Sequence, residues 1–136
     1  MNKKQIDAWI PKAYTALETV GIAKDKAVEK NYRGQIATFG ASVAMGSVIS
    51  AIAFFSDPGK SDAERPKLLQ AMYLLICKDD ETSPTLFDYA KKQWGDKVLQ
   101  AKFTEEVLNA AVALKLAMNL YKLIDKQPKG GKGESA

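Results

Sequence analysis

The stretch that decides the fold is residues 34–56, GQIATFGASVAMGSVISAIAFFS, in which no side chain carries a charge. Charged residues make up 26% of the chain, so a run of this length without one stands apart from its surroundings. Its large apolar side chains recur at helical spacing, in two sets that lie on either side of Gly46. The sets are Ile36, Phe39 and Val43, followed by Val48, Ile49, Ile52, Phe54 and Phe55. Two buried helical faces with a break near Gly46 are therefore predicted.

The same stretch is long enough to cross a bilayer, since about 20 apolar residues suffice. Serine, threonine and glutamine side chains and three glycines dilute its hydrophobicity, so we expect a packed helical centre and no membrane association. A protein with a single membrane span is the alternative, and it would depend on detergent for solubility. If the rings of Phe39 and Phe54 are buried, replacing either by alanine costs about 3–5 kcal/mol.

The rest of the chain also follows helical spacing, and no segment alternates convincingly at period two. The predicted fold is all-α: a compact single-domain bundle of about five to six helices over residues 1–126, followed by a disordered tail at residues 127–136. Loops are expected at residues 56–62 and 79–84, which contain clustered turn-forming residues.

Capping residues and prolines predict where the helices begin. Pro11 marks a kink or the first turn of the first helix; Ser61 or Asp62 caps the helix that contains Pro66; Ser83 and Pro84 begin a short helix through Trp94; and Thr104 caps the last helix, which runs to about Asp125.

The chain lacks histidine, which removes the usual general base and the commonest metal ligand. The neighbouring carboxylates Asp79, Asp80 and Glu81 are expected to form a solvated loop, with a Mg²⁺ site as the alternative. The single cysteine, Cys77, fits a reducing compartment and a buried apolar position, with a reactive thiol as the alternative. We therefore expect a cytoplasmic protein that is not an enzyme, with no catalytic residues, no metal site and no cofactor.

The basic residues offer a more positive indication of function. The formal net charge is +4, and only two of the twenty cationic residues are arginines, which favours contact with phosphates over base reading. Lys24, Lys26, Lys30 and Arg33 lie within ten positions, the last three at helical spacing, while Lys115, Lys122 and Lys126 are expected on one side of the last helix. These seven residues are the candidate RNA-binding set, and two ordinary solvated faces are the alternative.

Three aromatic residues outside the uncharged stretch, Trp9, Tyr14 and Trp94, are able to stack on bases. Their alternative role is in the core or at an interface, where aromatic side chains are more common.

Residues 30–57 resemble the signature of the small subunit of the type III-B CRISPR effector, the Cmr complex. Members of that family carry a tyrosine, a short amphipathic stretch and a glycine followed by apolar residues that end in an alanine–phenylalanine pair. The corresponding residues here are Tyr32, Gly46, Ala53 and Phe54. A long terminal helix rich in alanine and leucine is similar to residues 107–124.

The resemblance implies a compact all-α, non-catalytic subunit that acts in antiviral defence. Several copies would stack along the ribonucleoprotein, beside the backbone and large subunits, and contact guide RNA, target RNA or their duplex through a basic surface without base specificity. Self-association stays open. The small residues Gly40, Ala41, Ala44 and Gly46 would let helices approach closely. The alternative function is a helical protein–protein adaptor with no nucleic-acid role, whose binding would barely respond to salt.

Overall fold

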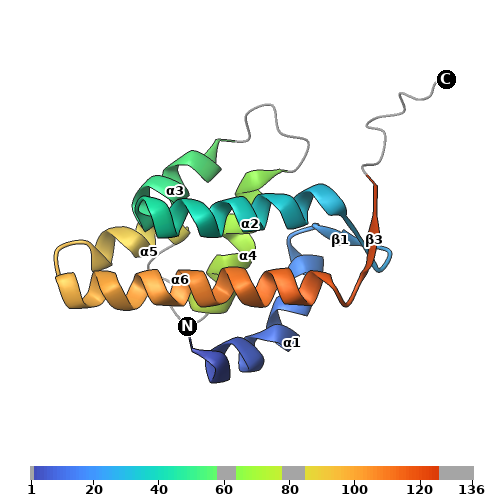
Figure 1. The fold of residues 1–136 in the computed structure, drawn as a ribbon, viewed down its shortest axis with the longest axis horizontal. Coiled ribbons are helices and arrows are strands. Elements are labelled where there is room, and N and C mark those ends of the chain that lie inside the picture. The colour runs from blue at the N-terminus through green and yellow to red at the C-terminus, as the bar shows by residue number, and fades with distance from the viewer. Residues whose placement is uncertain (1, 58–63, 78–84, 126–136) are drawn as a thin grey trace.

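The computed structural model describes residues 2–57, 64–77 and 85–125, which form six helices and one small sheet (Figure 1). In chain order the elements are α1 (Lys3–Thr19), β1 (Ala23–Lys24), β2 (Ala27–Glu29), α2 (Lys30–Met45), α3 (Val48–Ser56), α4 (Arg65–Ile76), α5 (Leu86–Gln93), α6 (Lys97–Met118) and β3 (Lys122–Ile124). The predicted all-α fold with five to six helices is confirmed, apart from the sheet. In the described ranges, every helix is too short or too polar to cross a membrane.

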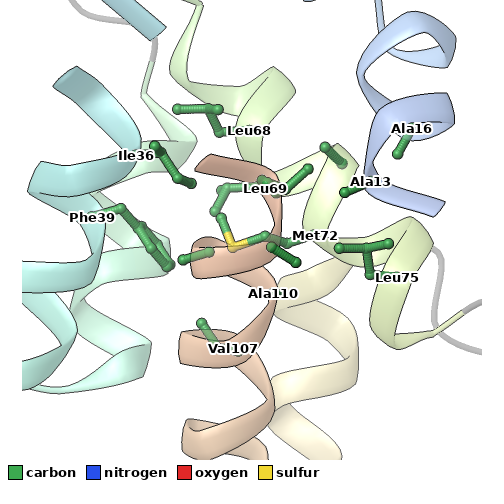
Figure 2. Packing of buried hydrophobic residues seen from close by; sticks show 14 of the residues in the cluster. Ala13, Ala16, Ile36, Phe39, Leu68, Leu69, Met72, Leu75, Val107 and Ala110 are labelled. Carbon is green, nitrogen blue, oxygen red and sulfur yellow. The ribbon is translucent and has the colours of Figure 1, made fainter. Parts of the chain in front are cut away.

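The longest helix, α6, is the centre of the packing and contacts α1, α2, α4 and α5. Figure 2 shows Met72 of α4 among side chains from α2, α4 and α6. The most extensive helix pairing is between α1 and α6, and both helices bury alanines: Ala13 and Ala16 on α1, and Ala110, Ala113 and Ala117 on α6.

The predicted break near Gly46 is confirmed. Gly46 ends α2 and its N–H donates to Ser42 O (2.9 Å), while Ser47 caps α3 by accepting a hydrogen bond from Ser50 N–H (3.1 Å). The two predicted faces are buried except at their margins. Ile49 is only half-buried, and Phe54 is 59% exposed, so the prediction that the ring of Phe54 belongs to the core is wrong.

The expectation that small residues of α2 allow close helix packing is also wrong. Ala41, Ala44 and Gly46 are exposed, and a Cβ added to Gly40 would meet no atom within 4 Å. Apart from Met45, the large apolar residues of α2 point into the core, so its small residues face outward. The outer surface of α2 carries no charged side chain after Arg33.

Several predicted helix starts differ from the observed ones. Pro11 lies in the interior of α1, which begins at Lys3 with Asn2 as its N-cap, so of its two predicted roles the first turn is wrong. The N-cap of α4 is Glu64 and that of α5 is Thr85. The residues predicted for these roles, Ser61, Asp62, Ser83 and Pro84, lie outside the described residues, as do most of the two predicted loops and the whole of the 127–136 tail.

The last helix begins earlier and ends earlier than predicted. The Asp96 carboxylate caps it by accepting from the N–H groups of Val98 (2.8 Å) and Leu99 (3.2 Å). Thr104 lies two turns inside the helix, where its hydroxyl donates to Gln100 O (2.9 Å). The helix ends at Met118 because the chain then turns into β3.

The sheet is the element that period-two analysis did not predict. β1 and β2 form an antiparallel hairpin, and β3 pairs in parallel with β2. Asp25 and Lys26 make the hairpin turn with positive φ values of 53° and 62°. One face of the sheet, formed by Ala23, Val28 and Leu123, packs against the core.

Candidate nucleic-acid interface

The outer face of the sheet carries two of the predicted RNA-binding lysines in one row. Lys24 lies opposite Ala27 in the hairpin, and Ala27 lies opposite Lys122 in the parallel pair. Opposed residues point to the same side of a sheet, and adjacent strands are about 4.8 Å apart, so the two lysines stand about 10 Å apart on either side of an alanine. Both lysines are exposed.

Lys26 adds a third ammonium group at the tip of the hairpin, where its side chain is exposed. The backbone of this tip is fixed to the third strand, because Lys122 N–H donates to Lys26 O (3.0 Å). The prediction that Lys26 shares a helical face with Lys30 and Arg33 is wrong, since Lys26 lies in a turn and α2 begins only at Lys30.

Lys30 is the first residue of α2 and directly follows the sheet. Its Nζ lies 3.5 Å from Asp125 Oδ1, and the two side chains are 63% and 93% exposed. An ion pair this exposed contributes little to stability. Another anion is therefore able to replace Asp125 beside the Lys30 ammonium at little cost in free energy. Arg33 is half-buried one turn further along α2, and its Nε is buried without a hydrogen-bond partner.

We call Lys24, Lys26, Lys30 and Lys122 the basic end. The carboxylates of Asp25, Glu29 and Asp125 belong to the same strands and turns. These four lysines and three carboxylates leave a net charge of only +1. The basic end is therefore a patterned surface of separate ammonium groups, and its field is weak at long range.

The three lysines predicted on one side of the last helix are not on one helix. Lys115 lies in the last turn of α6, whereas Lys122 lies in β3 beyond the end of that helix. Lys126 lies outside the described residues. The helical spacing failed here because the chain leaves the α6 axis after Asn119 and enters the sheet.

The aromatic residues considered for base stacking contribute to packing instead. Trp9 is only 9% exposed, and Trp94 is partly buried against the core. Tyr14 stacks on Tyr121 with ring centroids 4.2 Å apart, and the Tyr121 O–H donates to Tyr14 O (2.6 Å). Burial raises the pKa of the Tyr121 phenol, and the negative charge of Glu18 raises it further. The hydroxyl therefore stays protonated and remains a hydrogen-bond donor.

The chemistry of the remaining surface is sparse. A hollow of about 640 Å³ lies between α1, α4 and α5 and is lined by apolar, hydroxyl and amide side chains such as Leu69, Tyr73 and Leu86. Within the described ranges, no three His, Cys, Asp or Glu side chains lie close enough to hold a metal ion. Cys77 is 2% exposed, as its predicted apolar role requires. Residues 79–81, the acidic cluster, lie outside the described residues.

Two features of the surface were missed by sequence reasoning. The pairing of β2 with β3 joins segments 95 positions apart, and no local pattern indicates it. The Asp25–Lys26 pair was the available signal for the hairpin, since Asp tolerates the left-handed backbone that such turns require. The outer face of α6, which includes the carboxylate of Glu105, was also missed, because the candidate site residues were chosen by positive charge.

Comparison of the chain with protein-family models, with curated proteins and with solved structures found no match.

Proposed function

We propose that this protein is a non-catalytic, RNA-binding subunit of a type III-B CRISPR ribonucleoprotein, and that its basic end contacts the phosphate backbone of target RNA or of the guide–target duplex. The observation that carries the proposal is the row formed by Lys24 and Lys122. These lysines are 98 positions apart in the chain, yet they flank Ala27 on one exposed face. This surface forms only when β1, β2 and β3 are paired in the folded protein.

The chemistry of this row suits phosphates better than bases. Each lysine is a point charge on a flexible stem, and it attracts a phosphate without reading the sequence of the nucleic acid. Ala27 keeps the surface between the two ammonium groups low, so a backbone is able to pass between them. The hairpin tip adds Lys26 on a backbone that is hydrogen-bonded to β3.

The residues of the family resemblance support the same assignment through the fold. Tyr32 is buried in α2 and its hydroxyl accepts from Glu64 N–H (3.4 Å), Gly46 ends α2, and Ala53 and Phe54 lie on α3. All four residues therefore lie on α2, on α3 or at the junction between these two helices. In the proposed role the protein works in the cytoplasm with backbone and large Cmr subunits, guide RNA and target RNA.

The test compares two double charge reversals with the same change in net charge. Lys24→Glu with Lys122→Glu alters the row. Lys3→Glu with Lys4→Glu instead alters two exposed lysines in the first turn of α1, at the end of that helix that is not joined to the sheet. Binding of a fluorescent single-stranded RNA and of a guide–target duplex is measured by anisotropy at several salt concentrations.

We expect the first variant to bind more weakly, with a salt slope smaller by roughly 1.4 for single strands, since each lost phosphate contact removes about 0.7. The second variant should behave as wild type. Equal effects of the two variants would mean that only net charge matters, and the basic end would then be excluded as the specific contact.

The adaptor function is the second candidate, and two exposed apolar side chains favour it. Met45 is 88% exposed at the end of α2, and Phe54 is 59% exposed on α3. Co-purification of the tagged chain from its host separates the candidates. Recovery of short guide RNAs with large subunits supports the ribonucleoprotein role; a salt-insensitive protein partner without RNA supports the adaptor.

A further inference from the structure

One face of α6 follows a regular pattern and is only partly covered by the core, against which Leu108 and Val112 pack. Its residues recur at intervals of four, three, four, three and four, which places them on one side of the helix. They are Ala101, Glu105, Leu108, Val112, Lys115 and Asn119, and we call this set the α6 seam. All six are exposed or half-buried, and Asn119 still has helical backbone angles.

The α6 seam is hollowed at its centre. A depression of about 390 Å³ is lined by Ala101, Thr104, Glu105, Leu108, Asn109 and Val112, all of which belong to α6. Leu116 lies beside the α6 seam and is 41% exposed. The face thus combines apolar side chains at its centre with one carboxylate and one ammonium group further out.

The α6 seam is complementary to a second copy of itself that runs in the opposite direction. Alternating intervals of three and four are those of a coiled-coil contact line. When a second copy of α6 lies antiparallel, with the two-fold axis at the level of Ala110, each residue meets the one at the same distance on the other side of that level. Leu108 then meets the partner's Val112, Glu105 meets the partner's Lys115, and Ala101 meets the partner's Asn119.

We propose that the protein forms a two-fold symmetric homodimer in which the α6 seams of two copies pack antiparallel. The charges favour a second copy of the chain as the partner of this face. The two-fold axis places Glu105 of each copy opposite Lys115 of the other, and it brings apolar residues together at the centre. A two-fold interface uses the same patch on both subunits, so a patch that complements itself is what such an interface requires.

The arrangement has a consequence for the basic end. Because the two α6 helices run in opposite directions, their β3 strands emerge at opposite ends of the dimer. With the axis at the level of Ala110, the last residues of the two α6 helices, both Met118, are about 24 Å apart along the helix direction, so each dimer carries two separate basic ends. Dimer formation itself rests on α6 alone and does not depend on RNA binding.

Charge exchange tests the dimer without disturbing the core, since both charged residues are exposed. Molar mass is measured by sedimentation equilibrium from about 1 µM to about 1 mM, which covers weak and moderate dissociation constants. The proteins are wild type, Glu105→Lys, Lys115→Glu, and the variant carrying both changes. Lys24→Glu, on the outer face of the sheet, is the control for a charge reversal elsewhere.

We expect the wild type and Lys24→Glu to reach twice the monomer mass of 14.9 kDa. Each single exchange places like charges opposite each other and should raise the dissociation constant at least about tenfold, and the double exchange should restore it. A wild type that stays monomeric over the whole range overturns the proposal. Dimers that persist in both single variants, or a double variant that is not restored, overturn it as well.

The same variants separate this proposal from the RNA proposal. Glu105→Lys removes a negative charge, so it should dissociate the dimer without lowering the intrinsic affinity of a monomer for RNA. Lys24→Glu should weaken RNA binding and leave the dimer intact. Either proposal is therefore able to fail while the other stands.

Discussion

Phe39, Phe54 and Phe55 belong to the same uncharged stretch, but their surroundings differ greatly. Phe39 and Phe55 are fully buried and meet edge to face, with ring centroids 5.1 Å apart. Phe54 is 59% exposed, and the Arg65 guanidinium carbon lies 4.7 Å from its ring centroid. Neighbouring helical positions are about 100° apart around the axis, so only one of two adjacent rings is able to face the core.

Replacing these rings by alanine should therefore have unequal effects on the free energy of unfolding. Phe39→Ala leaves a cavity in the core and should cost about 3–5 kcal/mol. Phe54→Ala loses mainly an exposed cation–π contact and should cost about 0.5–1 kcal/mol. Urea denaturation of both variants measures the difference. Similar midpoints for the two would contradict the described orientation of α3.

Glu106 carries a half-buried carboxylate, and burial raises its pKa, partly opposed by the nearby charge of Lys102. A carboxyl with a raised pKa in the folded state binds more protons there than in the unfolded chain. Stability therefore falls as pH rises from the unfolded pKa, about 4.3, through the raised folded value.

Glu106→Gln should remove this pH dependence. The variant should have a higher thermal midpoint than wild type at pH 7, and the difference should shrink as the pH falls towards about 4, close to the unfolded pKa. Thermal melts followed by circular dichroism between these values measure it. A variant that is less stable than wild type at pH 7 would show that the carboxylate has a stabilising partner.

At the scale of elements, the start of α6 shows how a cap is distinguished from a residue of the same type inside a helix. Asp96 accepts two backbone N–H groups that lack partners within the helix. Thr104 lies further along, where backbone N–H groups already have helical partners, and its hydroxyl donates to a carbonyl instead.

Asp96→Ala should therefore destabilise the protein by about 1 kcal/mol, within the usual range for the loss of an N-cap. Thr104→Ala replaces a poor helix former by the best one and should change stability by less than about 0.5 kcal/mol. Denaturant titration of the pair provides the measurement, and each variant is the other's control. The reverse order would place the start of α6 at Thr104.

The buried faces of the helices were predictable because apolar spacing reports which side meets the core. The sets predicted on α2 and α3 are buried except for Phe54 and the half-buried Ile49. The caps were less predictable, since threonine, serine and aspartate occur both at helix ends and inside helices. The strands were not predictable, because segments of two or three residues carry no period and their pairing partners lie far away in the chain.

The same limit applied to the candidate site. Lysines at residues 24, 26, 30 and 122 were selected from their charge and do gather at one end of the molecule. They were predicted on two separate helical faces, and this was wrong for Lys26, which lies in a turn, and for Lys122, which lies in β3. The sheet brings them together, so their arrangement depends on a tertiary contact.

At the scale of the whole molecule, the Tyr121 side chain joins the segment after α6 to the middle of α1. Its O–H donates to Tyr14 O, and the two rings stack. Tyr121→Phe keeps the stacking and removes the hydrogen bond, so it should cost about 0.5–1.5 kcal/mol. Hydrogen exchange at residues 122–124 should accelerate more than exchange within α2. Uniform acceleration would mean that the bond supports the whole fold and not this junction.

The parallel pairing of β2 with β3 also sets an order of events during synthesis. A ribosome releases β2 first, and about 95 further residues must emerge before β3 reaches it. Closing so long a loop is slow compared with forming helices, so the two strands join late. Nascent chains and truncated products without β3 lack the row of Lys24 and Lys122. Only a chain synthesised through β3 presents the row that we propose to contact RNA, so an unfinished copy lacks that contact.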